Sequence, residues 1–256
     1  MNRKIFFDQV RGTVFVGFLS DDQVSGMDAV LNEWDRRKLS DIRWLAYMLA
    51  TDYHETAHTM QAIAEYGKGG GRSYGAIKAE TGKAYYGRGL VQLTWDYNYK
   101  KMGELLGVDL YRKPELALQL PIAVQIMFEG MIRGTFTGNK LSDYFTASKA
   151  DWYNARRIIN GTDRADLIAG YAKKFHAALE AATVRGSVIE PMPIPPDVPV
   201  SAPKPKPRPI PPEVPIAAGG AGAAAAAWWE GVPLEWIALA AVAVVIAVII
   251  IRKWRD

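Results

Sequence analysis

Residues 54–58, His-Glu-Thr-Ala-His, could carry either of two hydrolytic chemistries. His54, Glu55 and His58 match the H-E-x-x-H pattern, in which two histidines one helical turn apart bind Zn²⁺ and the glutamate is the general base. Glu55 near the carboxyl-terminal end of a helix could instead be the acid of a glycosidase, because the negative end of the helix dipole favours a protonated group there. The sequence of these five residues is compatible with both a zinc site and a glycosidase acid.

A catalytic zinc site needs a third protein ligand beside the two histidines. His176 is the only other histidine, and the chain has no cysteine. The longer H-E-x-x-H-x-x-G-x-x-H pattern fails, because Gln61 and Ala64 occupy its glycine and third histidine positions. Glu65 and Glu80 could serve as a downstream ligand, although both lie near the glycine-rich segment 66–75.

A glycosidase needs a second carboxyl group, which activates water or attacks carbon. Glu65 and Glu80 are the candidates for this role too. A single glutamate is more often a solvated surface residue, but Glu55 stands beside polar neighbours on an otherwise apolar helix.

The elements that must hold these groups are mainly helical over residues 1–189. Residues 1–23 predict an amphipathic helix, because polar residues interrupt the apolar stretch that a signal peptide needs. Ser20 and Gln23 form a capping box before a helix. Apolar spacing and cap residues predict the remaining elements, which are a helix over 41–60 capped by Ser40, a loop over 66–75, a short strand or hairpin and then a helix within 85–99, a helix over 122–134 opened by Pro121, a helix capped by Asp151 and a last helix over 164–182.

The remaining residues differ in composition. Twelve of the 15 prolines lie in residues 190–216, which predicts an extended polyproline II spacer of roughly 80 Å. With the alanine- and glycine-rich stretch that follows, residues 190–233 form the predicted linker. Residues 234–251 are long and apolar enough for one transmembrane helix, and residues 252–256 form a basic tail.

The basic tail favours a cytoplasmic carboxyl terminus, with the catalytic domain on the other side of the membrane. The expected location is the bacterial inner membrane, with the domain facing the cell wall; no export signal indicates how the domain would cross. The formal net charge is +4 at pH 7. No basic run is dense enough to predict binding to nucleic acid.

Three segments resemble glycoside hydrolase family 19, the plant-type chitinases and their bacterial and phage endolysin relatives. Residues 85–99, YYGRGLVQLTWDYNY, are similar to the fingerprint of this family. His-Glu-Thr at 54–56 is similar to the segment that carries its catalytic acid, and residues 157–175 to its INGG region. The opening residues are similar to the phage and prophage branch. The resemblance covers roughly residues 4–180.

The resemblance implies a role for each matching residue. Glu55 corresponds to the general acid and Thr94 to the residue whose hydroxyl holds the attacking water. Gln92, Tyr97, Asn98 and Asn160 correspond to residues that line the cleft or contact the sugar, and Thr162 replaces the second glycine of INGG.

The second carboxylate corresponds less closely, because this chain lacks the longer, disulfide-bearing insert of the plant enzymes. Glu65 is our choice and Glu80 the runner-up. Arg88, between two glycines, is placed among the substrate-binding residues, although it could equally stabilise the turn.

The resemblance implies a mainly α, lysozyme-like domain of two lobes with a small β element, and an inverting reaction without metal or cofactor. The membrane anchor favours an endolysin that cleaves peptidoglycan between N-acetylmuramic acid and N-acetylglucosamine, with a holin as a possible partner for release. A chitinase is the main alternative. A zinc metallopeptidase and a non-catalytic glycan-binding scaffold are weaker alternatives.

Overall fold

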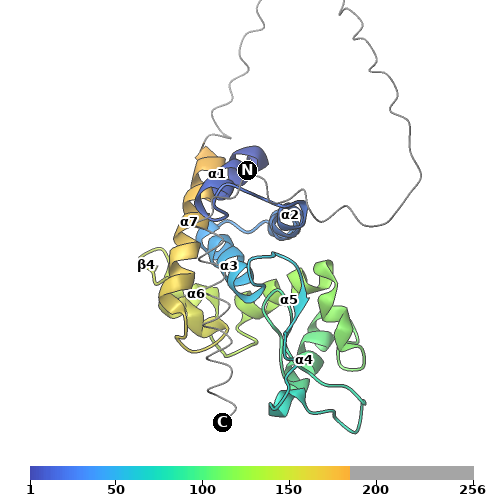
Figure 1. Cartoon of the computed structure of the whole chain (residues 1–256). Helices are drawn as coiled ribbons and strands as arrows, with labels where there is room; N and C mark the ends of the chain where they lie inside the picture. The colour runs from blue at the N-terminus through green and yellow to red at the C-terminus, as the bar shows by residue number, and fades with distance from the viewer. Residues whose placement is uncertain (185–256) are drawn as a thin grey trace, which may run out of the picture. The chain divides into compact units, whose positions relative to one another are not determined.

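The computed structural model describes residues 1–184, and these are mainly helical as predicted (Figure 1). The predicted linker, transmembrane helix and basic tail lie outside the described residues. Within the described part, no helix is long and apolar enough to cross a membrane. The elements in chain order are α1 Arg3–Thr13, α2 Asp21–Arg36, α3 Ile42–Glu55, β1 Ile63–Ala64, η1 Ser73–Gly75, β2 Arg88–Gly89, α4 Asp96–Leu106, η2 Pro114–Leu118, α5 Leu120–Arg133, α6 Leu141–Tyr144, β3 Phe145–Thr146, β4 Lys149–Ala150, η3 Asn154–Ile158 and α7 Ala165–Val184.

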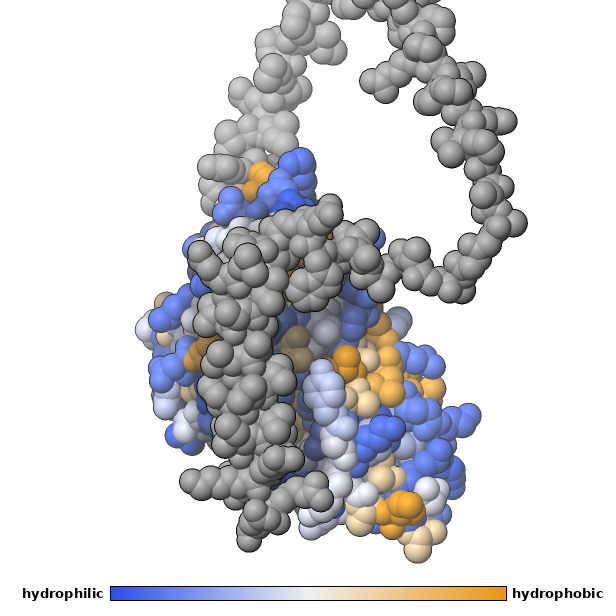
Figure 2. Space-filling model, in the orientation of Figure 1, coloured by the Kyte–Doolittle hydropathy of each residue, from blue (hydrophilic) through white to orange (hydrophobic). Residues whose placement is uncertain are grey.

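Helix α3 lies at the centre of the folded part, along α7 and between α7 and α5 (Figure 1). Its residues from Leu45 to Tyr53 are all buried. A helix that is buried on every side needs apolar or small residues all round, and this one has them apart from Thr51 and Asp52. Most charged residues of the domain lie on the surface, and hydrophilic residues cover much of the face visible in Figure 2, with smaller hydrophobic patches between them.

The predicted helix signals are confirmed at most positions. The Ser20 side chain and the Gln23 side chain form the reciprocal capping box of α2. Pro121 lies in the first turn of α5, where its missing N–H costs nothing. The stretch 85–99 forms β2 and then α4, and β2 pairs antiparallel with β1 through Ile63–Gly89 and Ala64–Arg88.

Two helix predictions need correction. The helix predicted over 41–60 begins with Asp41 as its cap, not Ser40, and ends at Glu55. The chain then turns sharply, because Ala57, His58 and Met60 adopt left-handed backbone conformations. Asp151 accepts the Asn154 N–H at 3.0 Å, but the element that follows is the short 3₁₀ helix η3 and not an α-helix.

Candidate active site

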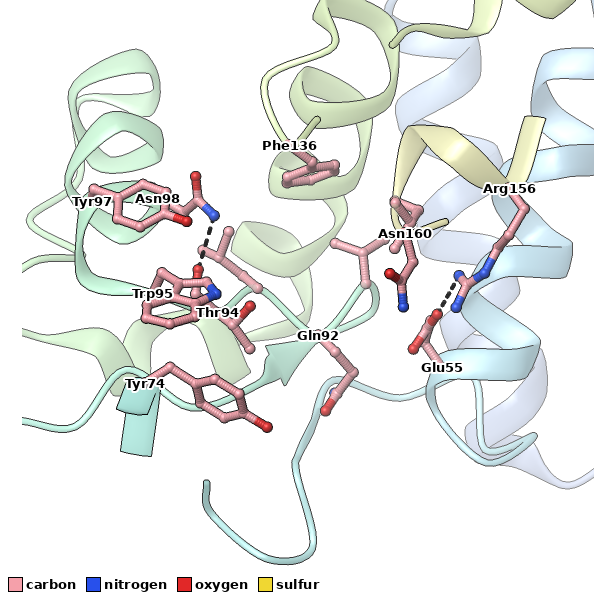
Figure 3. Close-up of a pocket in the computed structure, with 13 residues that line it drawn as sticks. Glu55, Tyr74, Gln92, Thr94, Trp95, Tyr97, Asn98, Phe136, Arg156 and Asn160 are labelled. Carbon is pink, nitrogen blue, oxygen red and sulfur yellow. Dashed lines mark hydrogen bonds and ion pairs between the residues drawn. The ribbon is translucent and has the colours of Figure 1, made fainter. Parts of the chain in front are cut away.

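One open cavity of about 450 Å³ gathers most of the predicted site residues (Figure 3). Glu55 and Asn160 lie on one side of it, and Tyr97 and Asn98 lie on the other side (Figure 3). Its other lining residues are Tyr74, Val91, Gln92, Leu93, Thr94, Trp95, Phe136, Arg156 and Ile159.

The carboxyl group of Glu55 is held by an ion pair. Glu55 is the last residue of α3, and its Oε1 accepts a hydrogen bond of 2.6 Å from Nη1 of Arg156 (Figure 3). Arg156 is nearly fully buried and also donates from Nε to the Asp163 carbonyl at 3.1 Å. The guanidinium therefore fixes the direction of the carboxyl group and can stabilise its negative charge after proton transfer.

The loop between β2 and α4 presents Gln92 and Thr94 between the two sides of the cavity (Figure 3). Gln92 and Trp95 adopt left-handed φ angles of 52° and 71°. The Gln92 amide donates to the carbonyls of Ile63 and Gly89, which holds the loop against β1. Strained residues on both sides of Thr94 are typical of a functional loop that the surrounding structure holds in place.

Aromatic rings cover the wall opposite Glu55. The Trp95 and Tyr97 rings stack with 6.0 Å between centroids, and Tyr74 contacts Trp95 edge-on at 5.6 Å. Trp95 is 37% exposed and Tyr97 60% exposed. Partly exposed rings of this kind offer flat apolar faces with polar tips.

Two amides complete the cavity. The Asn98 side-chain nitrogen donates to the Thr94 carbonyl at 3.0 Å, so its oxygen stays available to a ligand. The Asn160 oxygen accepts the Gly161 N–H at 2.9 Å, so its nitrogen stays available. The cavity can thus contact both donors and acceptors of a polar ligand.

Glu65 is not among the lining residues of the cavity, but it contacts one of them, Tyr74. Its carboxylate accepts hydrogen bonds from the Tyr74 hydroxyl at 2.8 Å and from the Gly87 N–H at 3.0 Å. Burial, followed by the bond to Glu65, raises the pKa of Tyr74. The Tyr74 hydroxyl therefore keeps its proton. Because Tyr74 lines the cavity and donates to Glu65, it links the Glu65 carboxylate to the cavity.

Glu80 lies in a different place. It accepts a hydrogen bond of 2.9 Å from the Tyr111 hydroxyl and lines a separate hollow beside Lys100 and Glu104 of α4. The bond to Glu80 raises the pKa of Tyr111 to about 12. Its placement argues against Glu80 as a partner of Glu55.

Arg88 does not line the cavity, and its placement favours the alternative role of stabilising the turn over contact with substrate. Its side chain is buried, stacks 3.5 Å above the centroid of the Tyr86 ring and donates to the Tyr86 and Ala84 carbonyls and to the Tyr99 hydroxyl. These contacts make it the residue that holds the 84–88 segment together, which was the alternative role.

The H-E-x-x-H match does not form a zinc-binding helix. Because α3 ends at Glu55, His58 lies in the following turn with φ 70°, and its ring stacks on Tyr53 at 4.0 Å. Burial lowers the pKa of both His54 and His58. Among residues 1–184, no group of three or more His, Cys, Asp or Glu side chains could hold a metal ion.

Sequence reasoning missed Arg156, Tyr74, Trp95 and Phe136. Trp95 lies within the recognised stretch 85–99, and Arg156 stands four residues before Asn160, so closeness to the motifs could have indicated both. Tyr74 and Phe136 carry no such signal, because only the folded chain brings them to the cavity.

The site combines an ion-paired carboxyl group, amides and exposed aromatic rings in an open cleft, as is typical of polysaccharide hydrolases. Residues 53–137 match the family described as chitinase class I, glycoside hydrolase family 19. The resemblance that the sequence motifs indicated is confirmed over this segment.

Chitinases and chitinase-like proteins of plants match shorter parts of this chain. An endochitinase of Arabidopsis thaliana, At2g43590, is 42% identical over 79 residues, 29% of this chain and 29% of the relative. An inactive chitinase-like protein of Hevea brasiliensis is 57% identical over 41 residues, 16% of this chain and 13% of the relative. The match thus spans less than a third of the length of these relatives. Since one of them is named inactive, the segment alone does not establish activity.

Chitinase C from Streptomyces griseus HUT6037 aligns with a TM-score of 0.44 and 21% identity, covering 71% of this chain and 76% of that chain.

Proposed function

We propose that this protein is a glycoside hydrolase that cleaves β-1,4 bonds of peptidoglycan, between N-acetylmuramic acid and N-acetylglucosamine, with Glu55 as the general acid. The observation that carries the proposal is the cavity itself, in which Glu55 faces amides and exposed aromatic rings. Aromatic faces and paired amides suit the apolar faces and N-acetyl groups of such sugars.

In the proposed inverting reaction, protonated Glu55 gives its proton to the glycosidic oxygen as the bond to the anomeric carbon breaks. A water held by the Thr94 hydroxyl attacks that carbon from the opposite face. Its proton passes to the Tyr74 hydroxyl, which lines the cavity, as Tyr74 gives its own proton to Glu65. Glu55 is then a carboxylate, which Arg156 stabilises across 2.6 Å. Tyr74 and Gly87 hold the Glu65 carboxylate in position for its role.

Chitin is the second candidate substrate. One observation favours it: the similar proteins include plant proteins named endochitinases. The predicted anchor over residues 234–251 favours peptidoglycan instead, because a membrane-tethered enzyme meets a wall fixed near the membrane.

The proposal includes the location. The anchor holds the protein in the bacterial inner membrane, and the linker 190–233 lets the domain reach the wall. The protein then acts as an endolysin of phage or prophage origin, and a holin is the partner expected for its release.

Purified peptidoglycan and chitin test this function when they are digested with the full chain and the products are read by mass spectrometry. We expect new reducing ends from peptidoglycan. Glu55→Gln should lower the rate by about 10²–10⁴-fold, because it removes the proton donor without changing the shape of the side chain. Glu65→Gln should lower it similarly, whereas Glu80→Gln should have little effect.

Three results would contradict the proposal. Cleaved peptide stems, or activity abolished by a chelator, would indicate a zinc peptidase. Tight glycan binding without products would indicate a scaffold. Products from chitin alone would make the protein a chitinase.

A further inference from the structure

The turn that follows Glu55 has an unusual backbone. Ala57, His58 and Met60 have φ angles of 51°, 70° and 56°, in the left-handed region that non-glycine residues rarely adopt. Such a backbone persists only where surrounding contacts hold it, and it is often found at functional sites. The turn directly follows the end of α3, so the contacts that hold the turn also hold the backbone next to Glu55.

Hydrogen bonds within the turn hold part of this backbone. The Thr56 hydroxyl donates to the Asp52 carbonyl at 2.7 Å and accepts the Met60 N–H at 3.1 Å. The His58 N–H donates to the Tyr53 carbonyl at 2.8 Å. Thr56 and Met60 are fully buried, so these bonds are shielded from water.

The amino-terminal part of α2 also contacts the turn and holds its backbone in place. Nε2 of Gln23 donates to the His58 carbonyl at 2.9 Å, and Nε2 of Gln61 donates to the Asp22 carbonyl at 2.5 Å. A Cβ atom at Gly26 would lie 1.7 Å from the Met60 carbonyl oxygen, so only glycine allows the turn to lie this close to the helix.

We propose that residues 22–26 of α2 and residues 56–61 form a clamp that positions Glu55 for proton transfer, with Gln23 and Gly26 as positioning residues. The inference rests on the proposed function, in which Glu55 is the acid. Arg156 holds the carboxyl group from one side, and the clamp holds the backbone next to Glu55 from the other. A displacement of about 1 Å at a catalytic group can lower a rate by about 10²-fold, so the backbone position matters.

Gln23→Glu tests the clamp with little change to α2. A glutamate preserves the acceptor that receives the Ser20 N–H at 3.0 Å, because S-x-x-E is also a capping box. It removes the donor to the His58 carbonyl and places a negative charge there. We expect kcat to fall about tenfold, because a small displacement of the catalytic carboxyl group lowers the rate of the chemical step. KM should change less than about twofold. The substrates are soluble peptidoglycan glycan strands and chitohexaose, and kcat is measured on whichever of them the full-length wild type cleaves.

Ser20→Ala is the matched control. It removes the hydroxyl that accepts the Gln23 N–H at 3.2 Å, but leaves the Gln23 amide on the His58 carbonyl. We expect a lower melting temperature with unchanged kcat. Hydrogen–deuterium exchange of residues 56–61 should become faster in Gln23→Glu and remain unchanged in Ser20→Ala.

The outcomes separate the two proposals. An active wild type, an inactive Glu55→Gln variant and a Gln23→Glu variant with wild-type kcat would overturn the clamp alone. Activity retained in Glu55→Gln, or a wild type that cleaves neither substrate, would overturn the proposed function. Gly26→Ala should lower kcat further than Gln23→Glu where it folds, and wild-type kcat in this variant would also overturn the clamp.

Discussion

At the scale of single residues, two features of the structure act on the Glu55 carboxyl group in opposite directions. The negative end of the α3 helix dipole repels negative charge, whereas the Arg156 guanidinium 2.6 Å away attracts it. The proposed acid has to hold its proton first and carry a negative charge afterwards. The ion pair with Arg156 suits the second state, after the proton has been given up.

Asp52, one helical turn before Glu55, is the least expected residue of the domain. It is fully buried, and within residues 1–184 neither of its carboxyl oxygens has a hydrogen-bond partner. Burial raises the pKa of Asp52 well above its usual value. The carboxyl group therefore stays protonated in the folded chain at pH values where the unfolded chain has already lost that proton.

We predict that Asp52→Asn increases stability more as the pH rises. Above the unfolded pKa of an aspartate, only the folded state of the wild type keeps the proton, so unfolding releases it and the free energy of unfolding falls with pH. The fall is about 1.4 kcal/mol per pH unit until the folded pKa is reached. Asparagine is neutral in both states and avoids this loss. Urea unfolding at pH 5 and pH 8 measures the difference between the two proteins.

Asp28→Asn is the control for this prediction, because the Asp28 side chain on α2 is 43% exposed, whereas Asp52 is fully buried. Its stability difference from wild type should change by less than about 0.5 kcal/mol between the two pH values. A constant difference between Asp52→Asn and wild type across this range would show that the Asp52 pKa is not raised by folding.

At the scale of elements, local signals predicted where helices begin better than where α3 ends. The capping box at Ser20 and the proline at 121 act within one turn, so they can be recognised in the sequence. The end of α3 at Glu55 depends on Gly26 and Gln23, which are some thirty residues away in the chain. Apolar spacing continued through Met60, and this extended the predicted helix too far.

The same limit applies to the site. Motif resemblance identified Gln92, Thr94 and Asn98, because they lie in one continuous stretch. The pairing of Glu55 with Arg156 joins residues 101 positions apart, and no local pattern indicates it. The role of Arg88 also depended on its burial, which the sequence alone left open.

Glu33, Arg37 and Glu129 form a largely buried group of charges that connects α2 to α5. Arg37 donates to Glu33 at 2.6 Å and to Glu129 at 2.7 Å, and both carboxylates are almost fully buried. Hydrogen bonds from Arg36, then Arg37, lower the pKa of Glu33. Arg37→Met should lower the free energy of unfolding by about 3 kcal/mol, because it leaves buried carboxylates without this partner.

The matched control is Arg133→Met, which removes an exposed partner of the same Glu129. It should cost less than about 1 kcal/mol, since exposed ion pairs contribute little. Both values come from urea unfolding at pH 7. If the two variants lose the same free energy of unfolding, burial does not determine how much an ion pair of this group contributes to stability.

At the scale of the whole molecule, composition divides the chain more sharply than any motif does. The described residues supply the folded domain, whereas thirteen of the 15 prolines and the longest apolar run lie beyond residue 189. Domain and tail therefore have separate tests: changes in the tail should affect where the protein is found and not whether it cleaves glycan.

The apolar run 236–251 carries the last prediction. Val244→Lys places a charge at its centre, which costs about 2.5–3.5 kcal/mol in a transmembrane helix. We expect the wild type in the membrane fraction of a bacterial lysate and a large part of Val244→Lys in the supernatant, with equal glycan cleavage in detergent. Ala225→Lys makes a similar change in the preceding linker and should stay with the membrane. A wild type found in the supernatant would contradict the anchor, and the preference for peptidoglycan over chitin would then lose its main support.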